Sequence, residues 1–395
     1  MGMDEVKVRE IDETEYRDFL GARIAAVGVG GGGSNMINHL AKKEELPEEI
    51  ALIAANTDMQ HLSKNRAREK IQLGKKLTKG LGAGADPQKG LAAAEESAAE
   101  IAEVLRGYDM VFISTGLGGG TGTGASPIIA DIVNKNDTLT VAIVTKPFDF
   151  EGDRRKKVAE EGLRELKSKV HCIIVIPNQR VMSILGTDAS KRQAEEKVND
   201  VLANAVLGIS NIVLGGNGEN DQNVDFADIR AAMENKGLAM MSIGEGYGSN
   251  AAMDAIKKAI DSEMLSHENL KGAQGIIACF EAHPDYSMSQ LNEACELINA
   301  LGTENTFMKI GNYWKEDFEK DYVRVTFLAT GFENEVALST VDKESVKNLP
   351  MTDESFVAYP TRVANGEIIM YDKSNGRVFD RDGFDEPTYI RNKQD

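Results

Sequence analysis

The amino-acid sequence predicts an α/β protein: a nucleotide-binding domain built on a parallel sheet, followed by a long helix and a smaller α/β domain. First, apolar strands in the first half of the chain end directly in glycine-rich loops, as they do where α/β sheets bind ligands. Second, residues 191–214 carry a helical stripe of apolar side chains, and strands alternate with helices again beyond them. Third, a length of 395 residues provides for two hydrophobic cores.

The composition narrows the class of protein. Hydrophobic residues make up 42% of the chain and charged residues 27%, which is typical of a soluble protein. Lys and Arg total 45 against 63 Asp and Glu, a formal net charge of −18, so we expect no nucleic-acid partner. We also expect no direct membrane insertion, because no signal peptide is evident and no apolar run nears the length of a membrane span.

The cysteines and histidines indicate no metal centre. Cys172, Cys279 and Cys295 are widely spaced, which favours reduced thiols in a cytoplasm over disulfides. The five histidines show no ligand spacing with them, so we expect no metal bound by side chains.

The first glycine loop follows a predicted strand at residues 23–29. Residues 28–33 formally satisfy the GxGxxG fingerprint of dinucleotide-binding proteins, and Ser34 and Asn35 then open a helix. A nicotinamide-dependent oxidoreductase is therefore a competing hypothesis. That class needs a carboxylate about 20 residues further on, which Asp58 could supply.

Two further glycine loops argue against the oxidoreductase. They are Gly80-Leu-Gly-Ala-Gly84 and Ser114-Thr-Gly-Leu-Gly-Gly-Gly-Thr-Gly-Thr-Gly-Ala125, and the second lies between an apolar strand at 110–114 and a helix expected from Ala125. A dinucleotide-binding domain uses one such turn, whereas three suit a triphosphate, because glycine lets backbone N–H groups converge on an anion. A flexible hinge is the alternative for the longest loop, and a GxxxxGK[ST] P-loop does not occur.

The run Gly118-Gly-Gly-Thr-Gly-Thr-Gly124 resembles the signature of the tubulin superfamily, and its flanks resemble the FtsZ family of bacterial cell-division GTPases. Gly80–Pro87 and Ala55–Asp58 are similar to further FtsZ nucleotide loops, in the expected order. The resemblance implies a tubulin/FtsZ-like fold, GTP and GDP as ligands, and Mg²⁺ held mainly by phosphates and water. The site residues that it assigns to these loops are Gly31, Gly32, Gly33, Ser34, Asn35, Asp58, Gly82, Ala83, Gly84, Gly118, Gly119, Gly120, Thr121, Gly122 and Thr123.

Three polar residues further along the chain each have an ordinary interpretation beside the family's. Glu151 and Arg155 are four apart, which fits a surface ion pair at the start of a helix. Asn178 follows an apolar strand at 172–177, where an amide is commonly a turn residue. The resemblance instead places the ion pair beside the ribose and phosphates and lets Asn178 read the guanine edge, for which an amide has both donor and acceptor.

The long helix predicted at 191–214 becomes, by resemblance, the central helix that joins the two domains. Its Asn199 would then lie opposite Asn178 and help to select guanine. The family commonly has an aromatic residue four positions earlier, stacked on the base, whereas this chain has Glu195. Nucleotide affinity is then expected to be lower, unless another ring such as Phe148 substitutes.

A short acidic segment follows the long helix. Asn223, Asp225 and Asp228 precede or open a helix, and capping of its N-terminal N–H groups explains Asp225. Capping does not explain a second carboxylate three residues along, Asp228, for which we expect no basic partner. By resemblance this segment enters the nucleotide site of the next subunit, where Asp225 and Asp228 polarise the water that attacks the γ-phosphate and Asn223 orients the two acids. No monomer would then hold a complete site, and head-to-tail contact would generate a filament.

Strands and helices alternate from residue 237 to 332, as expected of a second α/β domain, and a charged stretch follows. Within it, Asn375-Gly376 between two apolar runs predicts a hairpin. The last residues resemble the family's docking peptide at Asp385, Pro387, Tyr389, Ile390 and Arg391, which implies binding to a membrane tether such as FtsA. The expected organisation is a tail at 1–20, a GTP-binding domain at 21–190, a central helix at 191–214, a C-terminal activation domain at 215–332, a linker at 333–383 and a docking peptide at 384–395.

The resemblance therefore implies a GTPase that polymerises head to tail, hydrolyses GTP at subunit junctions, and forms the division ring in the cytoplasm, at mid-cell beneath the inner membrane. Two alternatives stay open at this point. One is a divergent paralogue that binds nucleotide, turns it over poorly and modulates filaments, as Glu195 suggests. The other is the oxidoreductase.

Overall fold

A computed structural model describes residues 21–185, 189–215, 222–234, 237–262, 270 and 272–332, together with three short strands nearer the C-terminus. The predicted tail (1–20) and docking peptide (384–395) lie outside the described residues. The chain divides into two units, Met1–Ser339 and Thr340–Asp395.

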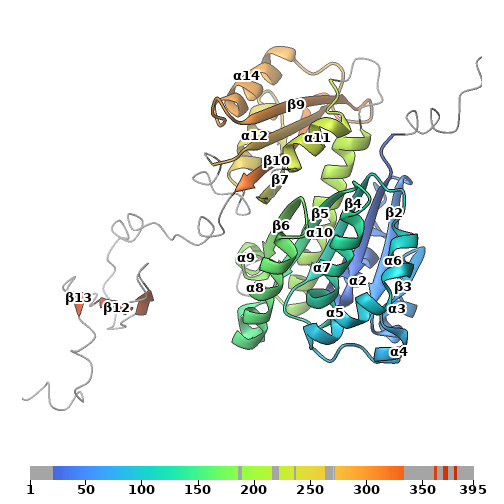
Figure 1. Ribbon diagram of the computed structural model, residues 1–395. Helices are drawn as coiled ribbons and strands as arrows, with labels where there is room; N and C mark the ends of the chain where they lie inside the picture. Colours follow the sequence, from blue (N-terminus) through green and yellow to red (C-terminus); the bar gives the residue numbers. More distant parts are fainter. Residues whose placement is uncertain are drawn as a thin grey trace, which may run out of the picture. The chain divides into compact units, whose positions relative to one another are not determined.

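Ten strands of the first unit form one sheet in the order β3-β2-β1-β4-β5-β6-β7-β10-β8-β9 (Figure 1). The strands are β1 (Ile24–Val29), β2 (Ile50–Asn56), β3 (Glu69–Gln72), β4 (Met110–Gly116), β5 (Leu139–Lys146), β6 (Cys172–Pro177), β7 (Gly237–Tyr247), β8 (Gly275–Ala282), β9 (Phe307–Trp314) and β10 (Tyr322–Phe332). Neighbouring strands from β3 to β7 are parallel, β10 is antiparallel to β7 and β8, and β8 and β9 are parallel. The parallel half carries the glycine loops.

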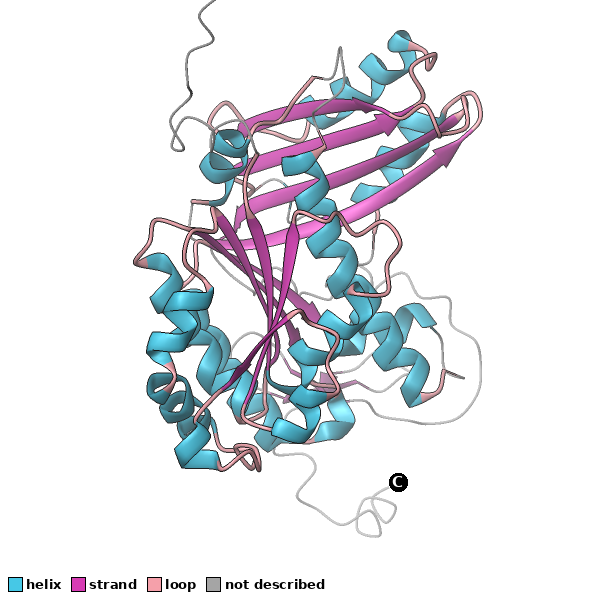
Figure 2. Ribbon diagram, turned by 90° about the vertical axis from the view of Figure 1, so that its right-hand side faces the viewer, coloured by secondary structure: helices cyan, strands magenta, loops and turns pink. Residues whose placement is uncertain are grey.

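Helices cover both faces of this sheet (Figure 2). They are α2 (Gly30–Leu40), α3 (Met59–Ser63), α4 (Lys75–Thr78), α5 (Pro87–Glu96), α6 (Ala98–Val104), α7 (Thr121–Asn134), α8 (Asp153–Lys167), α9 (Asn178–Leu185), α10 (Lys191–Leu214), α11 (Phe226–Met233), α12 (Ala251–Ile260) and α14 (Met288–Asn299), with a 3₁₀ turn, η1 (Asp149–Glu151). Strand β1 shows why both faces are covered, since all six of its residues are buried and alternate ones join different core clusters. Such a run of apolar residues is typical of a parallel strand between two helical layers.

The long helix α10 joins the two halves of the fold, as the sequence predicts. Ser190 caps the start of this helix with a capping box. Its hydroxyl accepts a hydrogen bond from the N–H of Gln193, and the side-chain oxygen of Gln193 accepts one from the N–H of Ser190. Its Val198 and Ile209 belong to one core cluster that also contains Phe112 of β4 and Leu328 of β10. The helix therefore packs against both the parallel and the antiparallel strands.

One expectation about α10 is wrong. This helix is long and apolar enough to cross a membrane by length and composition, contrary to the expectation that no run approaches that length, and 56% of its most apolar window is buried inside the protein. Core packing accounts for that apolar character.

The third glycine loop is shorter than the sequence suggests, because α7 begins at Thr121 and not at Ala125. Glycines 122 and 124 therefore lie in the first turns of the helix. A Cβ atom at Gly124 would lie 1.9 Å from the carbonyl oxygen of Pro87, so the close approach of α5 requires glycine inside this helix.

The second unit contains a three-stranded antiparallel sheet of β11 (Pro360–Arg362), β12 (Ile368–Tyr371) and β13 (Val378–Phe379). Strands β12 and β13 pair through Met370 with Phe379 and Tyr371 with Val378, which confirms the predicted hairpin pairing. The Asn375-Gly376 turn itself lies outside the described residues.

Candidate functional site

The strand register brings the predicted nucleotide loops to one edge of the sheet. Val29, the last residue of β1, pairs with Ala55 of β2 and Thr115 of β4. Further along the sheet, Gly116 pairs with Thr145 and Lys146 with Pro177. The segments that follow β1, β2, β4, β5 and β6 therefore all leave the sheet at its carboxyl edge, where α/β proteins bind ligands.

The first and third glycine loops touch through their backbones. Gly30 has a φ of +69°, and a Cβ atom there would lie 2.7 Å from the nitrogen of Gly122. A Cβ atom at Gly122 would in turn lie 2.3 Å from the Thr115 hydroxyl. Glycine is required at both positions, because the space that a side chain would need is occupied by backbone at Gly30 and by the Thr115 hydroxyl and the Gly116 carbonyl at Gly122.

The second glycine loop contacts the third. Gly82 donates its N–H to the carbonyl of Thr57 at 3.3 Å, and the Thr57 hydroxyl lies 2.6 Å from that of Thr121. A Cβ atom at Gly120 would meet the Cβ of Ala83 at 3.0 Å. The structure therefore brings the three predicted loops together as one cradle.

Two helices begin in this cradle and supply its binding groups. Helix α2 begins at Gly30 and α7 at Thr121, and neither start has a side-chain cap or an acidic residue in its first turn. Helix starts carry unpaired N–H groups and the positive end of the helix dipole. Gly31 and Gly32 are exposed, and the space around Gly119 is open for at least 4 Å. The cradle is suited to a polyphosphate.

A polar network supports one side of the cradle and contains a residue that the sequence did not single out. The imidazole of His61 lies 3.1 Å from the Asn35 side-chain oxygen and 3.3 Å from the Asn56 amide nitrogen. That same amide nitrogen reaches the buried Ser34 hydroxyl at 3.4 Å, while Asp58 caps α3 by accepting the N–H of His61 at 3.0 Å. Ser34, Asn35 and Asp58 are thus held in one hydrogen-bonded group.

Glu151 and Arg155 form the expected ion pair, and Arg155 also lies beside the third glycine loop. Their side chains form an ion pair with a distance of 2.5 Å from Glu151 Oε2 to Arg155 Nη1. Arg155 also lies against the glycine loop, since a Cβ atom at Gly118 would be 2.7 Å from Arg155 Cγ. The Arg155 side chain is 49% exposed, so its guanidinium is available to a ligand at the cradle.

Asn178 is the first residue of α9 and has an unpaired oxygen. Its side-chain Oδ1 is buried and has no hydrogen-bond partner among the residues that the structure describes. A buried acceptor without a donor is costly, so this oxygen is suited to a ligand N–H. Helix α9 packs on α10, which carries the half-buried Asn199.

The proposed replacement for the missing base-stacking ring is wrong in detail. Phe148 is 4% exposed, so its ring belongs to the core. Phe150 is 64% exposed and stacks on it with ring centroids 5.1 Å apart. Glu195 is exposed and lies 3.6 Å from Lys191 on the same helix. The exposed ring on this side of the site is therefore that of Phe150.

The acidic segment lies at the opposite edge of the sheet. Gly237, the first residue of β7, pairs with Cys172, the first residue of β6, so α11 precedes the amino edge. Leu214 also lies fifteen residues after Asn199, which is a rise of about 22 Å along α10 at about 1.5 Å per residue. The structure does not bring Asn223, Asp225 or Asp228 to the glycine cradle of the same subunit.

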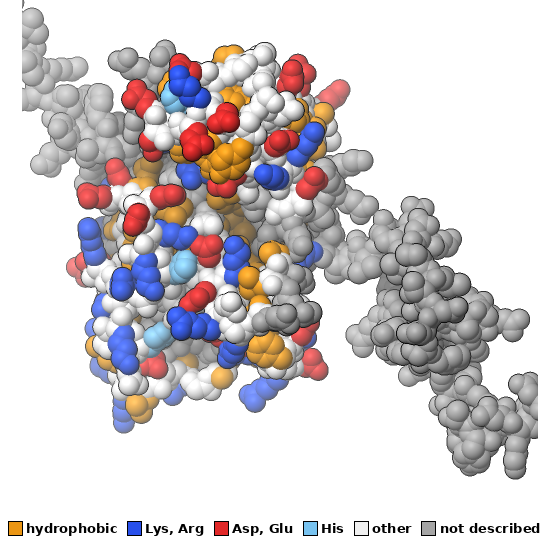
Figure 3. Space-filling model, turned by 180° about the vertical axis from the view of Figure 1, so that it is seen from behind, with side chains coloured by type: hydrophobic (Ala, Val, Ile, Leu, Met, Phe, Trp, Pro, Cys, Tyr) orange, Lys and Arg blue, Asp and Glu red, His pale blue; other side chains and the backbone are white. Residues whose placement is uncertain are grey.

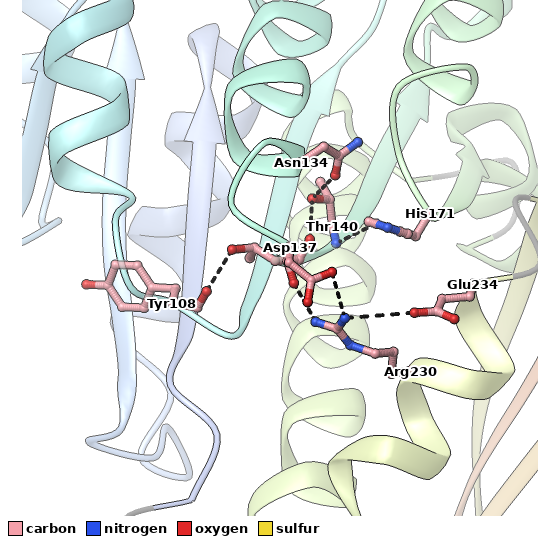
Figure 4. Close-up of polar contacts among 8 residues, drawn as sticks. Tyr108, Asn134, Asp137, Thr140, His171, Arg230 and Glu234 are labelled. Carbon is pink, nitrogen blue, oxygen red and sulfur yellow. Dashed lines mark hydrogen bonds and ion pairs between the residues drawn. The ribbon is translucent and has the colours of Figure 1, made fainter. Parts of the chain in front are cut away.

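An ion pair attaches α11 to the amino edge (Figure 4). Arg230 donates to the side-chain and backbone oxygens of Asp137 at 3.1 and 2.5 Å. Asp137 has a φ of +56° and lies in the turn before β5, which is held by a 2.8 Å bond from Thr138 to the carbonyl of Tyr108. The segment that carries the acids is therefore fixed to the nucleotide-binding half.

The two carboxylates form a reciprocal capping box at the start of α11. Asp225 accepts the N–H of Asp228 at 2.7 Å, and Asp228 accepts that of Asp225 at 3.2 Å. The expectation that Asp228 has no basic partner is wrong, because Lys309 of β9 places its Nζ 2.7 Å from Asp228 Oδ2. The sequence could not reveal this partner, since it lies on a distant strand.

A cleft of about 810 Å³ separates α10 from β7 and β10 and contains none of the predicted site residues. Arg324 lines it, bonded to Glu281 at 2.7 Å and paired with Glu45 at 3.6 Å across the two halves. Figure 3 shows that acidic and basic side chains are intermixed on this side of the molecule. We assign no role to the cleft.

Comparisons with known proteins agree with this geometry. The family model described as "Tubulin/FtsZ family, GTPase domain" matches residues 23–186, and "FtsZ family, C-terminal domain" matches residues 237–333. The chain is 42% identical over 392 residues to a cell division protein FtsZ of Helicobacter pylori, covering 99% of this chain and 97% of that protein. It is 46% identical over 310 residues to the Pseudomonas aeruginosa protein of the same name, covering 78% and 77%.

Solved structures give the same result. An empty FtsZ dimer from M. jannaschii superimposes with a TM-score of 0.71 at 39% identity, covering 81% of this chain and 91% of that one. CetZ2 from Haloferax volcanii, at 18% identity and a TM-score of 0.66, supports the fold alone. The comparisons exclude the oxidoreductase hypothesis and confirm the predicted fold class. This chain belongs to the FtsZ family of GTPases within the tubulin fold.

Proposed function

We propose that this protein polymerises head to tail with GTP bound and hydrolyses GTP at each junction between subunits, as the filament-forming component of the bacterial division ring. The observation that supports the shared site most directly is the separation of its parts. The glycine cradle lies at the carboxyl edge of the sheet and the acidic segment at the amino edge. Stacking of two copies along this direction joins one subunit's acids to the next subunit's cradle.

Within the cradle, the N–H groups at the starts of α2 and α7 bind the phosphates, and Arg155 adds a positive charge. Asn178 and Asn199 select guanine through hydrogen bonds from their amides. The buried, unpaired Oδ1 of Asn178 supports this assignment, because guanine offers N–H donors on its edge. All of the loop residues named from the sequence remain candidates for contact with the nucleotide.

In the acidic segment, Asn223, Asp225 and Asp228 orient the attacking water. The capping box uses Oδ1 of Asp225 and Oδ2 of Asp228, and Lys309 lies against that same Asp228 oxygen, so these contacts do not involve the other oxygen of either carboxylate. These two oxygens are available to hold a water and accept its proton. Phosphoryl transfer depends mostly on such positioning and on charge stabilisation.

The residues present fit a metal bound through the nucleotide. The described part of the chain contains no group of three or more His, Cys, Asp or Glu side chains able to hold an ion. Mg²⁺ would be held mainly by phosphate oxygens and water, and Asp58 is a candidate carboxylate in the loops. Bound there, it would neutralise phosphate charge.

The near full-length match to curated division proteins favours this function over a divergent paralogue with weak turnover. We further propose a cytoplasmic location at mid-cell beneath the inner membrane and tethering through residues 384–395 to a protein such as FtsA. The domain boundaries given from the sequence are part of the same proposal.

The test is phosphate release from the purified protein with GTP and Mg²⁺ over a series of protein concentrations, with sedimentation of the same samples. We expect turnover per subunit to rise from near zero above a threshold at which polymer begins to pellet. Constant turnover per subunit without polymer would contradict the shared site. Binding of GTP without turnover would favour the divergent paralogue.

A further inference from the structure

Three residues on one face of β9 contact the segment that runs from the end of α10 to Asp228. Lys309, Gly311 and Tyr313 are alternate residues of this strand and so share a face of the sheet. Tyr313 donates its hydroxyl to the carbonyl of Ile212, in the last turn of α10, at 2.6 Å. This bond fixes the point at which the acidic segment leaves the long helix.

The middle of the segment packs on the same strand. A Cβ atom at Gly311 would lie 2.7 Å from a methyl carbon of Val224, which is buried, so glycine makes room for this side chain. Along the free edge of β9, Gln222 and Asn312 exchange backbone hydrogen bonds at 3.0 and 3.1 Å. Strand β9 therefore holds the chain immediately before Asn223 by both its edge and its face.

The third contact is an ion pair. Lys309 Nζ lies 2.7 Å from Asp228 Oδ2, with 35% of the lysine side chain and 19% of the aspartate side chain exposed. That oxygen also accepts the N–H of Asp225, so two donors fix it. The bond to Asp228 also raises the pKa of Lys309, which favours the charged ammonium.

We propose that Lys309 is a positioning residue for GTP hydrolysis: it holds the Asp228 carboxylate so that its other oxygen faces the attacking water, and it offsets negative charge beside the incoming triphosphate. This inference rests on the proposed function, because it requires Asp228 to act at the junction. Lysine is suited to the task, since its ammonium is a compact charge at the end of a long side chain. Without Lys309, Asp225 and Asp228 would approach the γ-phosphate together. Neither carboxylate would then have a cation bonded to it among the described residues.

The test compares four variants in the full-length protein: Lys309→Met, Lys309→Arg, Asp228→Asn and the double variant Lys309→Met/Asp228→Asn. The matched control is Lys320→Met, which removes an exposed ion pair with Asp285 (2.5 Å) elsewhere in the same half of the fold. Turnover is measured per pelleted subunit at saturating GTP, and the critical concentration is measured by sedimentation.

We expect Lys309→Met to lower turnover per polymerised subunit about tenfold, the scale of a lost charged hydrogen bond, while Lys309→Arg restores most of it. The critical concentration should stay within about twofold, since Lys309 contributes little to the fold. The double variant should be no slower than Asp228→Asn, because both changes act through one carboxylate.

Each contrary outcome has a distinct meaning. Full turnover in Lys309→Met with none in Asp228→Asn would overturn the role of Lys309 and leave the proposed function intact. Full turnover in Asp228→Asn would overturn the proposed function itself. Equal losses in Lys309→Arg and Lys309→Met, with a raised critical concentration, would reduce Lys309 to a structural residue.

Discussion

Replacement of Gly122 by alanine tests whether the close packing of the glycine loops is needed for stability and nucleotide binding, because there is no space for a Cβ atom at this residue. A Cβ atom there would lie 2.3 Å from the Thr115 hydroxyl and 2.9 Å from the carbonyl oxygen of Gly116. Ordinary contacts of a Cβ atom begin at 3.4 Å, so the start of α7 must move by about 1 Å away from β4. That movement also separates it from Gly30, whose own contact with the Gly122 nitrogen holds the two loops together.

The size of the effect follows from two opposing contributions. Overpacking of a tight site costs about 1–3 kcal/mol. Alanine in place of glycine within a helix recovers up to about 1 kcal/mol. We therefore expect a net loss of about 1–2 kcal/mol, which lowers the melting temperature by about 2–8 °C for a domain of this size.

The measurement is thermal unfolding with and without GDP, followed by titration of a fluorescent guanine nucleotide. Gly119→Ala is the matched control, since the space around Gly119 is open and its backbone is not left-handed. We expect Gly122→Ala to lose both stability and nucleotide affinity, and Gly119→Ala to keep its stability. Equal melting temperatures for the two variants would refute the packing argument.

Three further predictions follow from the site. Asn178→Leu should weaken GDP binding about tenfold, the scale of a lost hydrogen bond to the base, in the same fluorescence titration; unchanged affinity would remove Asn178 from the base site. Arg230→Ala, which detaches α11 from Asp137, should slow turnover in polymer and leave nucleotide affinity unchanged; a weaker affinity would show that its effect reaches the cradle. Burial raises the pKa of Cys172 to about 12, so its thiolate is essentially absent at about pH 8. The half-buried Cys295 should therefore react first with a thiol reagent in native protein, as read by mass spectrometry, and modification of Cys172 at the same rate would contradict its burial.

The sequence predicted the parallel half of the fold because its signals are local. Apolar runs at 23–29 and 172–177 lead directly into glycine or a polar amide, and the observed strands end at those points. The contact between the loops is not local. Gly30 and Gly122 meet only because β1 and β4 are neighbours in register, which the spacing of the motifs does not reveal.

The acidic segment also has contacts that the sequence does not predict. The capping box joins Asp225 to Asp228, three residues along, so the expectation that capping explains Asp225 alone is wrong. Lys309 and Tyr313 were not open to prediction, because they reach the segment from a strand about 80 residues further along the chain. The start of α7 at Thr121 was also missed, since glycine has low helix propensity and only tertiary packing places it in a helix.

The shared active site is tested most directly by mixing two inactive variants of opposite defect. One carries Asp225→Asn and Asp228→Asn and keeps its cradle, and the other carries Arg155→Ala and Asn178→Leu and keeps its acids. In an equal mixture with random assembly, about one quarter of the junctions combine an intact cradle with intact acids. We predict that GTP turnover, near zero for either variant alone, returns to about a quarter of the wild-type value. A mixture as inactive as its components, although both variants enter the polymer, would contradict a site formed between subunits.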